Sequence, residues 1–116
     1  MANEVILIVN DDDDISSLFA DALEVNGFKT IKSNNASLAL QEIKSSPAKF
    51  DLVLVDRTSQ TGDFAKNVKS INISTKVVLT SAYSFLDVDV SESGYDRFLQ
   101  LPVTMDKLAS TVREIL

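Results

Sequence analysis

The sequence contains no cysteine and no histidine, and these two absences exclude most of the common catalytic chemistries. Without cysteine there is no disulfide, no thiolate nucleophile and no zinc site built on thiolates. Without histidine there is no imidazole for acid–base catalysis, for a Ser-His-Asp triad or for most transition-metal sites. The chemistry that remains uses the oxygen atoms of Asp, Glu, Ser and Thr.

Positive charge is also scarce, because 11 Lys and Arg face 17 Asp and Glu, which gives a net charge of −6. A negative domain repels the nucleic-acid backbone, so we expect no nucleic-acid binding by this domain. No apolar run is long enough to span a membrane, and the start lacks the basic residues of a signal peptide, so we expect a cytoplasmic protein. A chain of 116 residues that is 45% apolar suits a single domain over residues 1–116.

Five short segments have the pattern of β-strands. Three of them are nearly continuous in Val, Ile and Leu, which is typical of strands covered on both faces of a parallel sheet. A more polar, alternating segment fits an edge strand. The five are VILIV (5–9), FKTIKS (28–33), DLVLV (51–55), KVVLT (76–80) and RFLQL (97–101).

Helical patterns alternate with these strands. Apolar residues recur at helical spacing in four stretches, from Ile15 to Leu23, from Ala36 to Ile43, from Phe64 to Ile71 and from Met105 to Ile115. Asn26-Gly27 should end the first helix, Ser45-Ser46-Pro47 the second, and Asn35 and Thr104 should cap the second and the last. Residues 83–93 are rich in Asp and β-branched residues, which disfavours a regular helix. Such alternation predicts a three-layer α/β/α sandwich around an open parallel sheet.

Polar residues follow the central strands where each strand ends. Asn10 and Asp11 come after the first strand, Asp56 closes the third and Thr80 closes the fourth. Ligands of open parallel sheets bind at these carboxyl ends, so we expect Asp11 and Asp56 to converge there. Two carboxylates, carbonyl groups and waters suit Mg²⁺, and a nearby hydroxyl suits a phosphoryl oxygen. The pattern favours a site that holds a phosphoryl group, with an aspartyl phosphate as one option.

Several acidic and hydroxyl residues near these strand ends also have a purely structural interpretation. Asp13 and Asp14 fit a helix N-cap or first-turn acids. The hydroxyl of Thr80 could equally bond to the backbone at the end of a buried strand. Asp56 is the informative residue, because an acid that ends an apolar buried strand has no capping role.

Four segments in this order resemble the response-regulator receiver domain of two-component signalling: VILIVNDD, FDLVLVD, VVLTSA and DRFLQLP. The resemblance extends over essentially the whole length of the chain. It implies a flavodoxin-like fold whose five parallel strands lie in the order 2-1-3-4-5.

The resemblance also implies a role for each strand-end residue. Asp56 would accept a phosphoryl group from a histidine kinase or a phosphotransfer protein. Mg²⁺ would be the cofactor, held by Asp11, Asp56, the backbone carbonyl of Thr58 and, through a water, Asn10.

The same resemblance implies a switch and partners. Thr80 would turn toward the phosphate, and Phe98 occupies the aromatic position that rotates with it. The signal would pass to a downstream protein by direct contact, with self-association as a homodimer left open. A longer parent chain is the other explanation for the lack of an output module.

Three features depart from the family pattern. Asn10 replaces the first acid of the acidic pair, and Leu101 replaces the lysine that precedes Pro102. The loop RTSQTGD (57–63) lacks the usual proline-containing pattern. The lost lysine is a charge-assisted hydrogen-bond donor, worth about 1.5–3 kcal/mol. Arg57 is either a solvated surface residue or a partial substitute that contacts the phosphoryl oxygens.

Two other functions compete with phosphoryl acceptance. Leu101 and the altered loop favour a degenerate receiver that binds or dimerises without phosphorylation, whereas the retained Asp11, Asp56 and Thr80 count against it. A haloacid-dehalogenase-like phosphatase would need a second acid two residues after Asp56. That position is Thr58, so we expect no enzyme.

Overall fold

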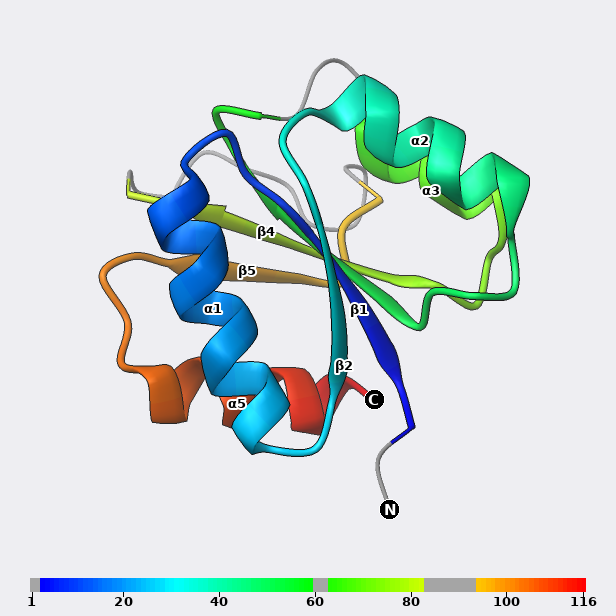
Figure 1. Ribbon diagram of the computed structural model, residues 1–116. Coiled ribbons are helices and arrows are strands. Elements are labelled where there is room, and N and C mark those ends of the chain that lie inside the picture. Colours follow the sequence, from blue (N-terminus) through cyan, green and yellow to red (C-terminus); the bar gives the residue numbers. More distant parts are fainter. Residues whose placement is uncertain (1–2, 60–62, 83–93) are drawn as a thin grey trace.

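A computed structural model describes residues 3–59, 63–82 and 94–116 (Figure 1). Strands and helices alternate along the chain, as the sequence pattern predicts. The elements are β1 (Val5–Val9), α1 (Asp13–Val25), β2 (Lys29–Ser33), α2 (Ala36–Ser45), β3 (Leu52–Asp56), α3 (Phe64–Ile71), β4 (Lys76–Ser81), β5 (Arg97–Gln100) and α5 (Met105–Ile115).

The five strands form one parallel sheet in the order β2-β1-β3-β4-β5, which confirms the expected strand order. The polar strand β2 lies at one edge, as its alternating pattern indicates. Because all the strands run in the same direction, their carboxyl ends lie along one edge of the sheet, at the upper left in Figure 1. Any chemistry carried by the strand ends is therefore concentrated in the loops of that edge.

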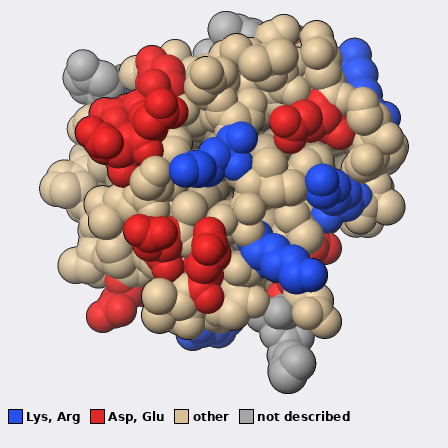
Figure 2. Space-filling view, in the orientation of Figure 1, with Lys and Arg blue, Asp and Glu red and all other residues tan. Residues whose placement is uncertain are grey.

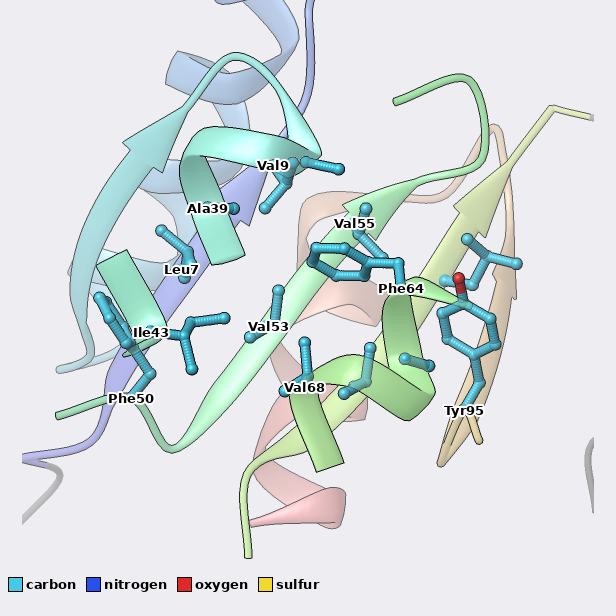
Figure 3. Packing of buried hydrophobic residues seen from close by; sticks show 14 residues of the cluster. Leu7, Val9, Ala39, Ile43, Phe50, Val53, Val55, Phe64, Val68 and Tyr95 are labelled. Atoms are coloured by element: carbon cyan, nitrogen blue, oxygen red, sulfur yellow. The ribbon is translucent and has the colours of Figure 1, made fainter. Parts of the chain in front are cut away.

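Helices cover both faces of the sheet, so the domain has two separate apolar cores. Alternation along β1 sends Ile6 and Ile8 to the face of α1 and α5, and Leu7 and Val9 to the face of α2 and α3. Figure 1 shows these two helix pairs on opposite sides of the sheet. The second core is drawn in Figure 3, where Phe64 of α3 packs over Val55 of β3. The three-layer sandwich is confirmed.

Capping residues explain where the helices begin and end. The cap of α1 is Asp12, whose carboxylate accepts the N–H groups of Asp14 and Ile15, so Asp13 and Asp14 are first-turn acids and not caps. Asn35 caps α2 and Thr104 caps α5, as predicted, by accepting backbone N–H groups at 2.8 and 3.1 Å. Backbone N–H groups at the start of a helix lack partners within the helix, which is why these side chains define its first turn.

The end of α1 also agrees with the sequence. Gly27 has φ of 92°, a conformation that residues with a Cβ rarely adopt, and its N–H donates to Glu24 O at 3.0 Å.

Strand bounds differ slightly from the predicted segments. Phe28 and Leu101 lie outside β2 and β5, whereas Asp56 and Ser81 are the last residues of β3 and β4. The Leu101-Pro102 peptide bond is cis. The irregular segment 83–93 lies outside the described residues. Within the described ranges, no helix is long and apolar enough to cross a membrane.

Candidate functional site

Asp56 lies at the last position of β3, opposite Thr80 in the adjacent strand. The hydroxyl of Thr80 donates to Asp56 Oδ1 at 3.1 Å, and the main chains are held by a bond from Arg57 N–H to Thr80 O at 2.8 Å. Asp56 is half-buried and Thr80 is 1% exposed. Strand pairing therefore places a partly accessible carboxylate against a buried hydroxyl.

The other carboxylate oxygen of Asp56 is held by the residue two positions further along the chain. Asp56 Oδ2 accepts the backbone N–H of Thr58 at 3.1 Å and also the hydroxyl of Thr58. The carbonyl oxygen of Asp56 accepts Ser59 N–H at 3.0 Å. These bonds form a tight turn after β3. The hydroxyl of Thr58 is a site group that the sequence analysis did not identify.

The loop after β1 comes close to the same turn. Backbone N–H of Asp11 donates to Ser59 Oγ at 3.1 Å, which joins the β1–α1 loop to the β3–α3 loop directly. Asn10 is 4% exposed, and its Oδ1 accepts Asp12 N–H at 2.9 Å. The pairing of Val9 with Val55 brings the acids that follow the two strands to one edge of the sheet. Asp11 itself is exposed.

This edge is strongly acidic. Asp11 to Asp14 are all exposed, and Figure 2 shows acidic side chains gathered over the start of α1. Like charges so close repel one another, and a bound cation would relieve that repulsion.

The donor set around Asp56 fits Mg²⁺, because every candidate ligand is oxygen. Among the described residues, no three acidic side chains lie close enough to hold a metal by themselves. Mg²⁺ does not need them, since it commonly binds through one or two carboxylates and keeps several waters. Asp56 supplies one such carboxylate, and the loop of Asp11 is joined to the turn that follows it.

The fifth strand brings apolar groups to this edge. Leu101 is half-buried and packs with Val103 and Met105 against the core on the face of α1 and α5. Its side chain therefore has a packing role.

Phe98 faces the other core and is also half-buried. Its ring meets that of Tyr95 edge-on, with the centroids 5.8 Å apart. Burial raises the pKa of the Tyr95 phenol to about 12. The position of Phe98 agrees with either a core or a switch residue.

Arg57 is exposed, and its guanidinium makes no ion pair with any residue that the structure describes. Part of the loop that follows, residues 60–62, lies outside the described residues.

Known proteins share this fold and part of this sequence. The transcriptional regulatory protein ZraR of Klebsiella oxytoca is 33% identical over 116 residues, which is 96% of this chain and 26% of ZraR. The transcriptional regulatory protein CpxR of Escherichia coli K12 is 31% identical over 115 residues, again 96% of this chain and 48% of CpxR. The chain thus spans at most about half the length of these curated relatives. No family model matches it.

Solved structures agree with the topology. The CheY-like response regulator receiver domain protein of Methanospirillum hungatei JF-1 superimposes with a TM-score of 0.86 at 23% identity, covering 97% of this chain and 93% of that one. Response regulator protein TrrA of Thermotoga maritima, in complex with Mg²⁺-BeF, gives 0.83 at 26% identity, covering 97% and 99%. This is the fold of a response-regulator receiver domain. The sequence similarity to ZraR and CpxR lies within one part of each of those longer proteins.

The fold brings some of the predicted site residues together and not others. Asp56, Thr80, Thr58 and the loop of Asn10 and Asp11 come together at one edge, in direct or one-step hydrogen-bond contact. Leu101 adds no polar group at that edge.

Proposed function

We propose that this receiver domain accepts a phosphoryl group on Asp56 and passes the signal on by contact with another protein. The observation that carries the proposal is the hydrogen-bonded pair of Asp56 and Thr80 at adjacent strand ends, beside the acidic loop. In the transfer, an oxygen of the Asp56 carboxylate forms a bond to phosphorus. The bond from phosphorus to the donor breaks, and the donor leaves with that electron pair.

Mg²⁺ would be held by Asp11, Asp56 and the carbonyl of Thr58, with Asn10 acting through a water. Bound there, it would neutralise charge on the phosphoryl oxygens during transfer. The buried Asn10 amide already orients the loop by accepting Asp12 N–H, and this keeps Asp11 next to Ser59. The related TrrA binds Mg²⁺-BeF, which supports the same ion here.

The phosphorylated state would be read by Thr80 and Phe98. Thr80 already donates to the carboxylate and can donate to a phosphoryl oxygen after a rotation of its side chain. Arg57 directly follows Asp56 in the sequence, is exposed and has no ion pair among the described residues, so its guanidinium is available to the phosphate. We infer that it partly replaces the lysine lost at Leu101.

The partners follow from this function. A histidine kinase or a phosphotransfer protein would supply the phosphoryl group in the cytoplasm, and a downstream protein would receive the signal. Homodimerisation of the phosphorylated form is a further output. The domain would act as a signalling module and not as an enzyme with turnover.

Intact mass spectrometry tests the proposal. The purified chain is incubated with Mg²⁺ and acetyl phosphate, with and without a chelator. We expect one phosphoryl adduct that needs Mg²⁺ and is lost in Asp56→Asn. Asp51→Asn, an acid at the opposite ends of the strands whose carboxylate accepts Val5 N–H, serves as the matched control and should keep the adduct.

An absence of any adduct on the wild type would instead favour the degenerate receiver, which binds partners without phosphorylation. Continuous release of phosphate from a generic ester would point to a phosphatase.

A further inference from the structure

Hydrogen bonds fill most of the acceptor capacity of the Asp56 carboxylate. Oδ2 accepts both the N–H and the hydroxyl of Thr58, and Oδ1 accepts the hydroxyl of Thr80. A carboxylate offers about four lone-pair positions, two on each oxygen. Oδ2 has therefore no position left, whereas Oδ1 has one.

Phosphoryl acceptance on Asp56 needs more free lone-pair positions than these bonds leave. One oxygen must use a lone pair to form the bond to phosphorus, and the other must offer one to the cation. Oδ2 cannot take either role while both donors of Thr58 are in place. One of the two bonds must break first.

The two donors of Thr58 differ in how easily they can leave. The N–H belongs to a turn that is also held by the bond from Ser59 N–H to the carbonyl of Asp56 at 3.0 Å. The hydroxyl sits on an exposed side chain and needs only a rotation about Cα–Cβ to reach water. The turn does not depend on the hydroxyl, because both backbone bonds remain without it.

We propose that Thr58 is a positioning residue whose hydroxyl occupies the carboxylate oxygen that Mg²⁺ requires. The inference rests on the proposed function, and it assigns to the Thr58 side chain a role separate from that of its backbone carbonyl. The hydroxyl competes with the cation for Asp56 Oδ2, the oxygen on the side of Thr58, because Oδ1 faces Thr80 of β4 on the side of β3 away from β1 and Asp11. It lowers the affinity of the unphosphorylated domain for Mg²⁺, and it leaves the carboxylate when the ion binds.

Titration of the protein with Mg²⁺ alone, without a phosphodonor, tests this competition. Thr58→Val removes the hydroxyl and keeps the shape of the side chain and the backbone N–H. We expect Thr58→Val to bind Mg²⁺ about three- to tenfold more tightly than the wild type, the range that one net hydrogen bond covers. Thr58→Ser restores a hydroxyl and should return the affinity to that of the wild type. Dissociation constants come from calorimetry or from amide chemical shifts.

Thr30→Val is the matched control, because Thr30 also bonds to a carboxylate through its hydroxyl but lies in β2, away from Asp56. Its affinity for Mg²⁺ should equal that of the wild type. Equal or weaker binding by Thr58→Val, with normal binding by the wild type, would overturn the inference and leave phosphoryl acceptance standing. Failure of the wild type to bind Mg²⁺ or to form the adduct would overturn both.

Discussion

Two parts of the same edge of the sheet differ sharply in chemistry. At the ends of β1, β3 and β4 the contacts are polar. The bond from Thr80 to Asp56 joins two strands, the bond from Asp11 N–H to Ser59 joins two loops, and the bond from Thr58 N–H closes the turn after β3. At the end of β5, Leu101, Val103 and Met105 pack against the core on the face of α1 and α5, and the aromatic pair of Tyr95 and Phe98 belongs to the opposite core.

Under the proposed function, these two parts serve two tasks. Accepting a phosphoryl group would use the carboxylate of Asp56 and the hydroxyl groups beside it, which belong to the first part. Holding the phosphorylated state would gain from a cation after β5, where this chain has Leu101. The chain should therefore be better at accepting the group than at using it to shift its conformation.

Removal of the Asp11 side chain should have the largest effect on the polar part of this edge. Asp11→Ala deletes a proposed ligand, so we expect the affinity for Mg²⁺ to fall about 10- to 100-fold, as removal of groups at metal sites commonly does. Calorimetric titration with Mg²⁺ measures it. Asp14→Ala removes the same charge from the first turn of α1 and should change the affinity less than threefold. Equal losses in the two variants would mean that Asp11 acts only through its charge.

A cation introduced in the apolar part should have the next largest effect. Leu101→Lys should increase the affinity for beryllofluoride in the presence of Mg²⁺ about tenfold, since a charge-assisted hydrogen bond to the phosphoryl analogue is gained. Leu101→Met keeps the apolar contact without the charge and should leave the affinity unchanged. A gain in both variants would show that packing, and not charge, limits binding.

Truncation of Arg57 should have a smaller effect of the opposite sign. Because the guanidinium is exposed and screened by solvent, we expect Arg57→Ala to weaken beryllofluoride binding only about two- to fivefold. Arg97→Ala, an exposed arginine of β5, is the control. If the Arg57 and Arg97 variants both bind like the wild type, Arg57 is a surface residue.

The smallest expected effect is a loss of stability at high pH, caused by Tyr95 in the apolar part. The pKa of Tyr95 is raised from 10.0 to about 12, so ionisation of the phenol opposes folding. Its contribution to stability is complete below pH 10, the value for the unfolded chain, and is lost as the pH rises toward about 12. In a Tyr83→Phe background, an ultraviolet titration should show Tyr95 ionising well above pH 10. Over the same range, Tyr95→Phe should lose less thermal stability than its parent. Ionisation near pH 10 would mean that the ring is open to water.

Most of the fold was predictable from the sequence because its periodicities are strong. Continuous Val, Ile and Leu in β1, β3 and β4 can only be buried on both faces, which requires helices on each side of a parallel sheet. Asp13 and Asp14 were predicted as an N-cap or as first-turn acids, and they are first-turn acids, since among the four consecutive aspartates the backbone geometry selects Asp12 as the cap. Some strand ends also differ by one residue from the predicted segments.

Only those site residues that lie at the end of a strand were predictable from the sequence. Asp56 and Thr80 could be found because strand register brings ends together, whatever the loops do. The hydroxyls of Thr58 and Ser59 were missed because their contacts depend on the turn that follows Asp56. The triplet of an aspartate followed two residues later by threonine was the available signal, since such side chains commonly bond across short turns.

The backbone of Thr80 is fixed from both sides. Its neighbours are Asp56 in β3 and Leu99 in β5, and Arg57 N–H adds one more rung to the ladder beyond the acceptor. Sliding of β4 would break bonds in two directions at once, whereas a turn about one side-chain bond breaks a single contact. Under the proposed function, Thr80 would therefore respond to phosphorylation of Asp56 by a change of side-chain rotamer while its backbone stays in place. The response would extend to whichever neighbour fills the space that the methyl group vacates.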